Sequence, residues 1–172
     1  QPIDSDTIHF KCMPKKWMAV SWIALQDITE DCGPINFIPK SHTLTDIDYS
    51  MLNLKWEKND SKEQENNYNI YNNDIKDLIK VNNLKIEKLY IKKGQAIIWD
   101  SNLLHGGSKI LNKNTTRFSQ VQHYFFKGCD KYYHPMFSKP LKGIYAEKWC
   151  DENNNILKSG CDFASPNANG ID

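Results

Sequence analysis

The sequence predicts an all-β protein, either a sandwich or a barrel built from short strands. Two observations lead to this fold class: short runs of β-branched and aromatic residues recur along the chain, and turns containing glycine or proline separate them. A third is that few segments have helical periodicity. A chain of 172 residues, of which 40% are hydrophobic, suits one core. We therefore expect a single domain over residues 1–172.

Five segments are expected to form the strands. The first, WMAVSWIALQDI, is apolar enough to be a buried strand, and the second ends at Pro39. The expected strands are 17–28, 35–38, 89–91, 95–99 and 117–126, with turns at 31–34 and 92–94. Residues 128–172 are expected to be less regular, because the strand pattern weakens there and Pro135, Pro140 and Pro166 interrupt it.

Residues 45–83 differ in composition from the rest of the chain. They are rich in Asn, Asp, Lys and Glu and hold few apolar residues before Ile75, Leu78 and Ile79. We interpret them as a partly helical insertion outside the core sheet. Two interpretations of its role stay open at this point: it is a lid over a site, or it is a solvated loop.

Composition argues against several functional classes. The net charge of +1 gives no reason to expect binding to nucleic acid or to a membrane surface. There is no apolar run near the roughly 20 residues that a membrane span needs, and no leader pattern. The five cysteines are odd in number and lack C-x-x-C spacing, so reduced thiols in a cytoplasmic protein are expected. The composition is that of an ordinary soluble globular protein.

Three short segments carry side chains suited to metal chemistry. Asp4 and Asp6 are two residues apart, so on a strand both point to the same face. His105 follows an expected buried strand, and Gly106 and Gly107 after it permit close backbone approach. Two carboxylates and one histidine on one side of a metal ion leave positions open for substrate and oxygen. This is the layout of non-haem Fe(II) oxygenases.

Arg117 follows His105 by twelve residues, in the next expected strand. Its guanidinium can hold a carboxylate through two parallel hydrogen bonds, which suits the distal carboxylate of a dicarboxylic co-substrate. Each of these signals alone has an ordinary explanation, and their order and spacing favour a site. Packing in the core is the simpler interpretation of the other candidates, which are His123, Trp17, Trp99 and Trp149.

At these positions the sequence resembles the phytanoyl-CoA dioxygenase family, over roughly three quarters of the chain. In the family, the CGPI segment corresponds to an N-G-x-L turn, and PKSH corresponds to a P-G-S-H segment whose histidine, here His42, orders a loop near the site. Relative to the family domain, an N-terminal part is missing, since Gln1 lies only a few residues before the first motif. The matching stretches are WIALQDI (22–28), CGPI (32–35), IPKSH (38–42), KGQAIIWD (93–100) and HGG (105–107).

The resemblance implies a double-stranded β-helix, the cupin-type jelly roll. It also implies a non-haem Fe(II)/2-oxoglutarate-dependent dioxygenase, which uses O2 to hydroxylate a small organic substrate and releases succinate and CO2. The iron and its co-substrate 2-oxoglutarate supply this chemistry. By position, Asp6 and His105 correspond to iron ligands, and Arg117 corresponds to the 2-oxoglutarate anchor. Trp22 corresponds to an aromatic residue that lines the co-substrate site.

The sequence departs from the family at Asp4, which stands where the H-x-D pattern has its histidine. Imidazole suits Fe(II), whereas carboxylates favour harder ions such as Mn or Mg. Three interpretations follow: Asp4 is a ligand in a two-carboxylate site, the change inactivates the site, or His9 substitutes. We discount His9, because its odd offset from both aspartates would point it to the other strand face.

Two alternative functions therefore stay open beside the dioxygenase. The first is a catalytically inactive binding or structural domain with the same fold. The second, more remote, is a cupin-like enzyme that uses another metal.

Overall fold

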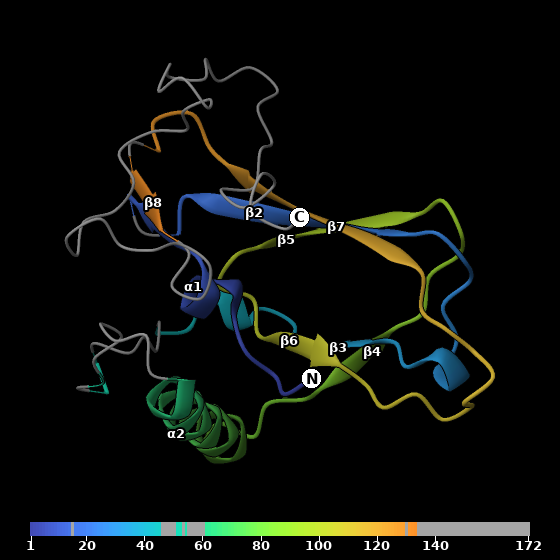
Figure 1. Cartoon of the computed structure of the whole chain (residues 1–172), viewed down its shortest axis with the longest axis horizontal. Helices are drawn as coiled ribbons and strands as arrows, with labels where there is room; N and C mark the ends of the chain where they lie inside the picture. Colours follow the sequence, from blue (N-terminus) through green and yellow to red (C-terminus); the bar gives the residue numbers. More distant parts are fainter. Residues whose placement is uncertain (15, 46–50, 53, 55–60, 130, 134–172) are drawn as a thin grey trace.

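The computed structural model describes residues 1–14, 16–45, 51–52, 54, 61–129 and 131–133 (Figure 1). The helices and 3-10 turns of this part are α1 (Asp6–His9), η1 (Glu30–Cys32), η2 (Ser41–Thr43) and α2 (Ser61–Val81). The strands are β1 (Lys11–Met13), β2 (Met18–Ala24), β3 (Ile35–Phe37), β4 (Glu87–Leu89), β5 (Ala96–Asp100), β6 (His105–Gly107), β7 (Ser119–Phe125) and β8 (Lys131–Tyr133).

The strands form three antiparallel sheets with the orders β5-β2-β7, β4-β3-β6 and β1-β8. Figure 1 shows the two three-stranded sheets as layers that face each other, with α2 outside them. The predicted all-β class is confirmed. Within the described residues, no helix is both long and apolar enough to cross a membrane.

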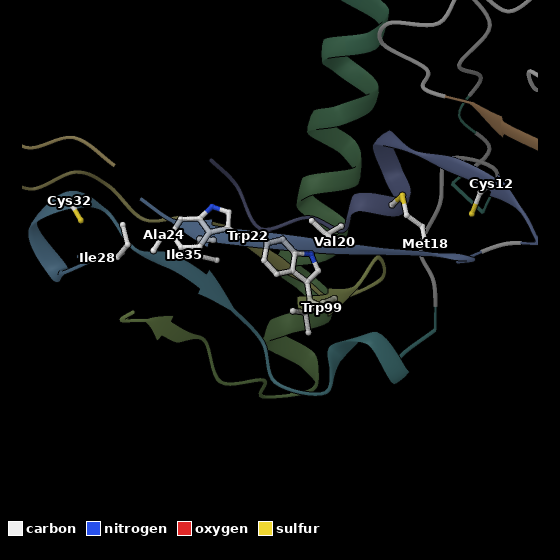
Figure 2. Close-up of a cluster of buried hydrophobic side chains, with 10 residues drawn as sticks. Cys12, Met18, Val20, Trp22, Ala24, Ile28, Cys32, Ile35 and Trp99 are labelled. Carbon is white, nitrogen blue, oxygen red and sulfur yellow. The ribbon is translucent and has the colours of Figure 1, made fainter. Parts of the chain in front are cut away.

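The core lies on the inner face of β2. Its residues alternate, and Met18, Val20, Trp22 and Ala24 are all buried on one face. Trp99 of β5 is buried beside them, and Figure 2 shows these side chains gathered along β2. Burying a side chain of this size contributes roughly 1.5–3 kcal/mol to stability. The packed β5-β2-β7 sheet therefore holds the residues that it carries in fixed positions.

Helix α2 belongs to the segment interpreted as an insertion. Tyr71 and Ile75 are four residues apart, hence on one helix face, and both are buried against Ile8, Ile38 and Leu104. The helix ends in a Schellman turn, in which Leu84 N donates to Ile79 O and Asn83 N donates to Lys80 O. Asn83 takes the left-handed conformation this turn requires, with φ of 50°. A solvated loop is therefore the wrong interpretation for residues 61–81.

The strand predictions for 35–38 and 95–99 are confirmed by β3 and β5, and the strand predicted at 17–28 is present but shorter, because β2 ends at Ala24. Two others are shifted. The strand expected at 89–91 is Glu87–Leu89, with Ile91 making only an isolated bridge to Ile28. The strand expected from Arg117 begins at Ser119, where pairing with Ala24 at the end of β2 sets the boundary.

Trp17 was expected in the core but is 43% exposed, because its ring nitrogen donates to Lys127 O at the surface. Cys12, Cys32 and Cys129 form no disulfide with one another, and Cys150 and Cys161 lie outside the described residues. The predictions for Trp149 and for residues 134–172 lie outside the described residues.

Candidate metal centre

Asp4 lies at the edge of β6, opposite His105. Asp4 N donates to His105 O and His105 N donates to Asp4 O, both at 2.9 Å. Residues paired in this way in an antiparallel ladder project their side chains to the same face. The chain then leaves the ladder. Ser5 is still extended, and the helical turn α1 begins at Asp6. The prediction that Asp4 and Asp6 share one strand is therefore wrong, although both lie beside His105.

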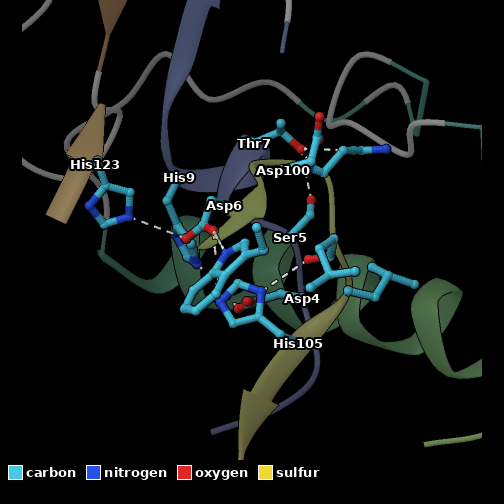
Figure 3. A network of polar contacts seen from close by, with 12 residues as sticks. Asp4, Ser5, Asp6, Thr7, His9, Asp100, His105 and His123 are labelled. Atoms are coloured by element: carbon cyan, nitrogen blue, oxygen red, sulfur yellow. Dashed lines mark hydrogen bonds and ion pairs between the residues drawn. The ribbon is translucent and has the colours of Figure 1, made fainter. Parts of the chain in front are cut away.

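Asp6 is held from the inner face of the β5-β2-β7 sheet. Trp99 Nε1 donates to Asp6 Oδ2 at 2.8 Å, and His123 Nε2 donates to Asp6 Oδ1 at 3.3 Å. Val20 is the cross-strand partner of both Trp99 and His123, so the three residues form one row across the sheet. Figure 3 shows the carboxylate of Asp6 between His123 on one side and His105 on the other.

His105 presents one ring nitrogen to Asp6. Its Nδ1 lies 3.0 Å from Leu103 O, and a carbonyl can only accept, so Nδ1 carries a proton. Its Nε2 lies 3.8 Å from Asp6 Oδ2, beyond ordinary hydrogen-bond distance. In the neutral ring this Nε2 holds a lone pair that faces a carboxylate, and a cation between them would satisfy both groups. A backbone carbonyl on the other ring nitrogen is the usual support for a metal-binding histidine.

The surroundings keep Asp6 ionised. Burial raises the pKa of its carboxyl group, but favourable contacts outweigh burial and hold the pKa below its usual value. These contacts are the hydrogen bond from His123, the charges of His105 and His123, and the hydrogen bond from Trp99. An ionised carboxylate is the form that binds a metal cation.

Asp4 is only 1% exposed and already has two donors on one oxygen. Tyr68 of α2 donates to Asp4 Oδ2 at 2.5 Å, and His9 Nε2 donates to the same oxygen at 3.2 Å. The prediction that His9 points away from Asp4 assumed that these residues form a strand, and this assumption is wrong. Residues 6–9 form a helical turn, which returns His9 to Asp4.

The donor set fits a metal ion in part. Asp6 and His105 face each other, with the Asp6 carboxylate ionised and Nε2 of His105 directed toward it. Among the described residues, however, no three His, Cys, Asp or Glu side chains converge closely enough to hold an ion. Asp4 is engaged by Tyr68 and His9 instead, so two protein donors are in place and a third is not.

Arg117 lies along β6 from His105. Its Nη1 donates to Gly33 O at 2.5 Å, and both terminal nitrogens lie 3.3 Å from where a Cβ at residue 107 would stand. Gly107 thus leaves room for the guanidinium. Residues 105 and 107 are on the same strand face, about 6.6 Å apart at 3.3 Å per residue. The structure therefore brings Arg117 to the face that carries His105.

Trp22 and His42 occupy different surroundings. Trp22 is 3% exposed on the inner face of β2, where its cross-strand neighbours are Ile97 and Val121. His42 is exposed, and only its carbonyl is used, accepting from Asn102 Nδ2 at 3.3 Å. Its segment still fixes the chain just before the site, because Leu104 N donates to the neighbouring Ser41 Oγ at 2.8 Å.

Sequence reasoning missed two residues of this site. His123 was interpreted as a core histidine, yet it contacts Asp6. Its even offset of six from Arg117 was a usable signal, because it places both residues on one face of an extended chain. Tyr68 had no such signal, since its contact with Asp4 depends on how a helix 64 residues away packs.

Comparison with known proteins agrees with the fold. Residues 1–119 match the family model Phytanoyl-CoA dioxygenase (PhyH). The non-haem alpha-ketoglutarate-dependent epimerase SnoN from nogalamycin biosynthesis is similar in structure, with a TM-score of 0.50 and 15% identity. That match covers 94% of this chain and 53% of SnoN, so the chain spans about half the length of this neighbour. EctD from S. alaskensis with bound Fe matches at a TM-score of 0.41 and 20% identity, over 70% of this chain and 36% of EctD. No curated protein matches.

The family match covers more than half of the sequence, and the chain therefore belongs to the phytanoyl-CoA dioxygenase (PhyH) family. Its fold is the jelly roll of Fe/2-oxoglutarate-dependent oxygenases, as the resemblance implied. The family takes its name from a dioxygenase, and the structural neighbour SnoN is described as a non-haem, alpha-ketoglutarate-dependent enzyme.

Proposed function

We propose that this chain is a non-haem Fe(II)/2-oxoglutarate-dependent dioxygenase that hydroxylates a small organic substrate and releases succinate and CO2. The observation that carries the proposal is the facing pair of Asp6 Oδ2 and His105 Nε2, 3.8 Å apart. A carboxylate held ionised and an imidazole with its lone pair turned toward it form a partial cation site inside the jelly roll.

In this proposal Asp6 and His105 hold the iron, while Asp4, which the sequence predicts as a third ligand, accepts hydrogen bonds from Tyr68 and His9 instead. When bound, iron and 2-oxoglutarate would supply the electrons that activate O2, which is the oxidant. The chain's own residues position these groups. Trp99 and His123 fix the orientation of the Asp6 carboxylate, and the hydrogen bond to Leu103 O fixes the tautomer of His105.

Arg117 is proposed to anchor the distal carboxylate of 2-oxoglutarate. Its guanidinium lies beside Gly107, about 6.6 Å along the strand from His105 at 3.3 Å per residue. A five-carbon diacid is about long enough to bridge such a distance. Trp22 and Val121, paired across the inner face of the sheet, are proposed as the apolar wall of the co-substrate site. An apolar wall excludes water from the reacting groups.

The neighbour SnoN supports a co-substrate of this kind, because one of its structures was solved with Fe3+, alpha ketoglutarate and nogalamycin RO. For this chain we propose a small-molecule substrate and O2 as its partners, and action in the cytoplasm. The net charge of +1 gives no reason to expect a polyanionic substrate.

The experiment is an assay of succinate release with Fe(II), ascorbate, O2 and 2-oxoglutarate, with and without panels of small organic substrates. We expect succinate from the unaltered chain, including uncoupled turnover, and none from His105→Ala. His42→Ala removes an exposed imidazole outside the site and serves as the matched control. Binding of 2-oxoglutarate without any metal dependence and without succinate would contradict the proposal and indicate a catalytically inactive binding domain.

A further inference from the structure

We infer that Asp4 is the docking point of helix α2 and not an iron ligand. Through Asp4, the helix fastens to the segment that carries Asp6. Asp4 and Tyr68 are thus positioning residues for the metal centre. This inference rests on the proposed function in one respect, namely that Asp6 and His105 bind the metal. The docking itself does not depend on it.

The contacts of Asp4 carry the first step. Asp4 Oδ2 accepts from Tyr68 at 2.5 Å and from His9 at 3.2 Å. The two donors occupy both lone pairs of this oxygen, so at least one hydrogen bond would have to be given up to bind a metal there, in a site where Asp4 is 1% exposed. A buried polar group that loses its partner destabilises the protein. The two donors therefore favour Asp4 as an acceptor over Asp4 as a metal ligand.

The second step is that α2 is fastened at the neighbouring residue as well. Ser5 N donates to Tyr71 Oη at 3.3 Å, and Ser5 Oγ lies 3.2 Å from the same hydroxyl. Tyr71 is fully buried, and its ring is stacked with that of Tyr68 at a centroid distance of 6.4 Å. Two tyrosines three positions apart on one helix face thus form hydrogen bonds with residues 4 and 5, directly before Asp6.

The third step explains why aspartate suits this position. A carboxyl oxygen can accept from two donors at once, as Asp4 Oδ2 does here. An imidazole nitrogen has a single lone pair and can accept from only one. A histidine at residue 4 would therefore lose either Tyr68 or His9. The departure from the family's H-x-D pattern matches the presence of a helix that docks on this residue.

The test compares conservative and disruptive variants of the full chain. Asp4→Asn keeps an oxygen that can accept both hydrogen bonds, whereas Asp4→Ala and Tyr68→Phe each remove the contact. Amide hydrogen exchange of α2 in metal-free protein reports the docking, and anaerobic Co(II) titration reports metal affinity. Asp77→Asn on the exposed face of α2 and Tyr90→Phe at the surface are the matched controls.

We expect Asp4→Asn to match the unaltered chain in both measurements. Asp4→Ala and Tyr68→Phe should each raise exchange throughout α2 and weaken Co(II) binding several-fold. The double variant should be no worse than the more severe single variant, because residues that share one contact are not additive. Asp4→His should give no gain in metal affinity.

Two results would overturn the inference. One is a loss of metal affinity of about tenfold or more in Asp4→Asn with unchanged α2 exchange, or a gain in Asp4→His, since either would make residue 4 a ligand. The other is α2 exchange that is the same in Tyr68→Phe and Asp4→Ala as in the unaltered chain. If the unaltered chain binds no metal, the proposed function fails, while the exchange data still decide the docking.

Discussion

His123 and Asp6 lie 117 positions apart in the sequence, yet His123 Nε2 is 3.3 Å from Asp6 Oδ1. The contact arises because β7 pairs with β2 in the register that places His123 opposite Val20. This hydrogen bond holds Oδ1 of Asp6, and the other oxygen, Oδ2, faces His105. The inner face of one sheet thus sets the orientation of a carboxylate that faces a histidine of the other sheet.

Replacing His123 should therefore weaken metal binding. In His123→Leu the imidazole is lost, and Asp6 Oδ1 has no donor from β7. The expected loss of Co(II) affinity is roughly 10–100-fold, which is typical for partners of a metal ligand. Isothermal titration under anaerobic conditions measures it, with His42→Leu as the control. Equal affinity in His123→Leu and the unaltered chain would show that His123 has no part in orienting Asp6.

Trp99→Phe isolates one hydrogen bond. It keeps an aromatic ring in the core but removes the Nε1 donor that is 2.8 Å from Asp6 Oδ2. We expect the free energy of unfolding to fall by about 1–3 kcal/mol, since a buried charged acceptor loses a partner. Urea unfolding curves measure this change, and Trp17→Phe at an exposed position is the control for the loss of an indole. A Trp99→Phe protein as stable as the unaltered chain would contradict the role given to Trp99.

Gly106→Ala tests the close approach between β6 and the N-terminal segment. A Cβ at residue 106 would lie 2.5 Å from Pro2 O and 3.0 Å from Pro2 C, which are backbone atoms that cannot rotate away. We expect a loss of about 1–3 kcal/mol in unfolding free energy, as for other overpacked sites.

Gly107→Ala is the comparison for this prediction. Its Cβ would meet side-chain atoms alone among its three nearest neighbours, namely the terminal nitrogens of Arg117 at 3.3 Å and Gln1 Cβ at 3.5 Å. A flexible side chain can move, so we expect a smaller loss of stability but weaker 2-oxoglutarate binding. Equal stability of the two variants would indicate that the segment before Asp4 is not held against β6.

Arg117→Lys should separate co-substrate binding from metal binding. A lysine keeps the positive charge but loses the planar fork that grips a carboxylate through two hydrogen bonds. We expect 2-oxoglutarate affinity to fall by at least about tenfold, the equivalent of 1.4 kcal/mol. Co(II) affinity should stay unchanged, because Arg117 contacts Gly33 and Gly107 and neither proposed metal ligand. Parallel loss of both affinities would place Arg117 in a structural role.

Local pattern was enough to predict the strands β2, β3 and β5, because alternation and turn residues are encoded within a few positions. The closeness of Asp6 and His105 also followed from their order, once the resemblance supplied a frame. The strand assumed for residues 4–9 was wrong. A helical turn of four residues is too short to show a periodic pattern in the sequence. This turn brings His9 to Asp4.

The contacts of Asp4 could not have been predicted from the sequence. They depend on α2, whose apolar face is visible as a pattern but whose docking place is set by tertiary packing. Tyr68 and Tyr71 resemble ordinary core residues until the structure places their hydroxyl groups on residues 4 and 5. Polar contacts between distant segments carry no local periodicity, and this is why the replaced ligand position remained open at the level of sequence.

The most direct test of the account is an anaerobic titration of the full chain with Fe(II) in the presence of 2-oxoglutarate. The measurement follows the metal-to-ligand charge-transfer absorption that forms when 2-oxoglutarate chelates Fe(II). We predict that the unaltered chain develops this band, that His105→Ala abolishes it, and that Arg117→Lys requires more 2-oxoglutarate to reach it. Absence of the band at saturating Fe(II) and 2-oxoglutarate, in a protein shown to be folded, would contradict the assignment of this chain as an Fe(II)/2-oxoglutarate dioxygenase.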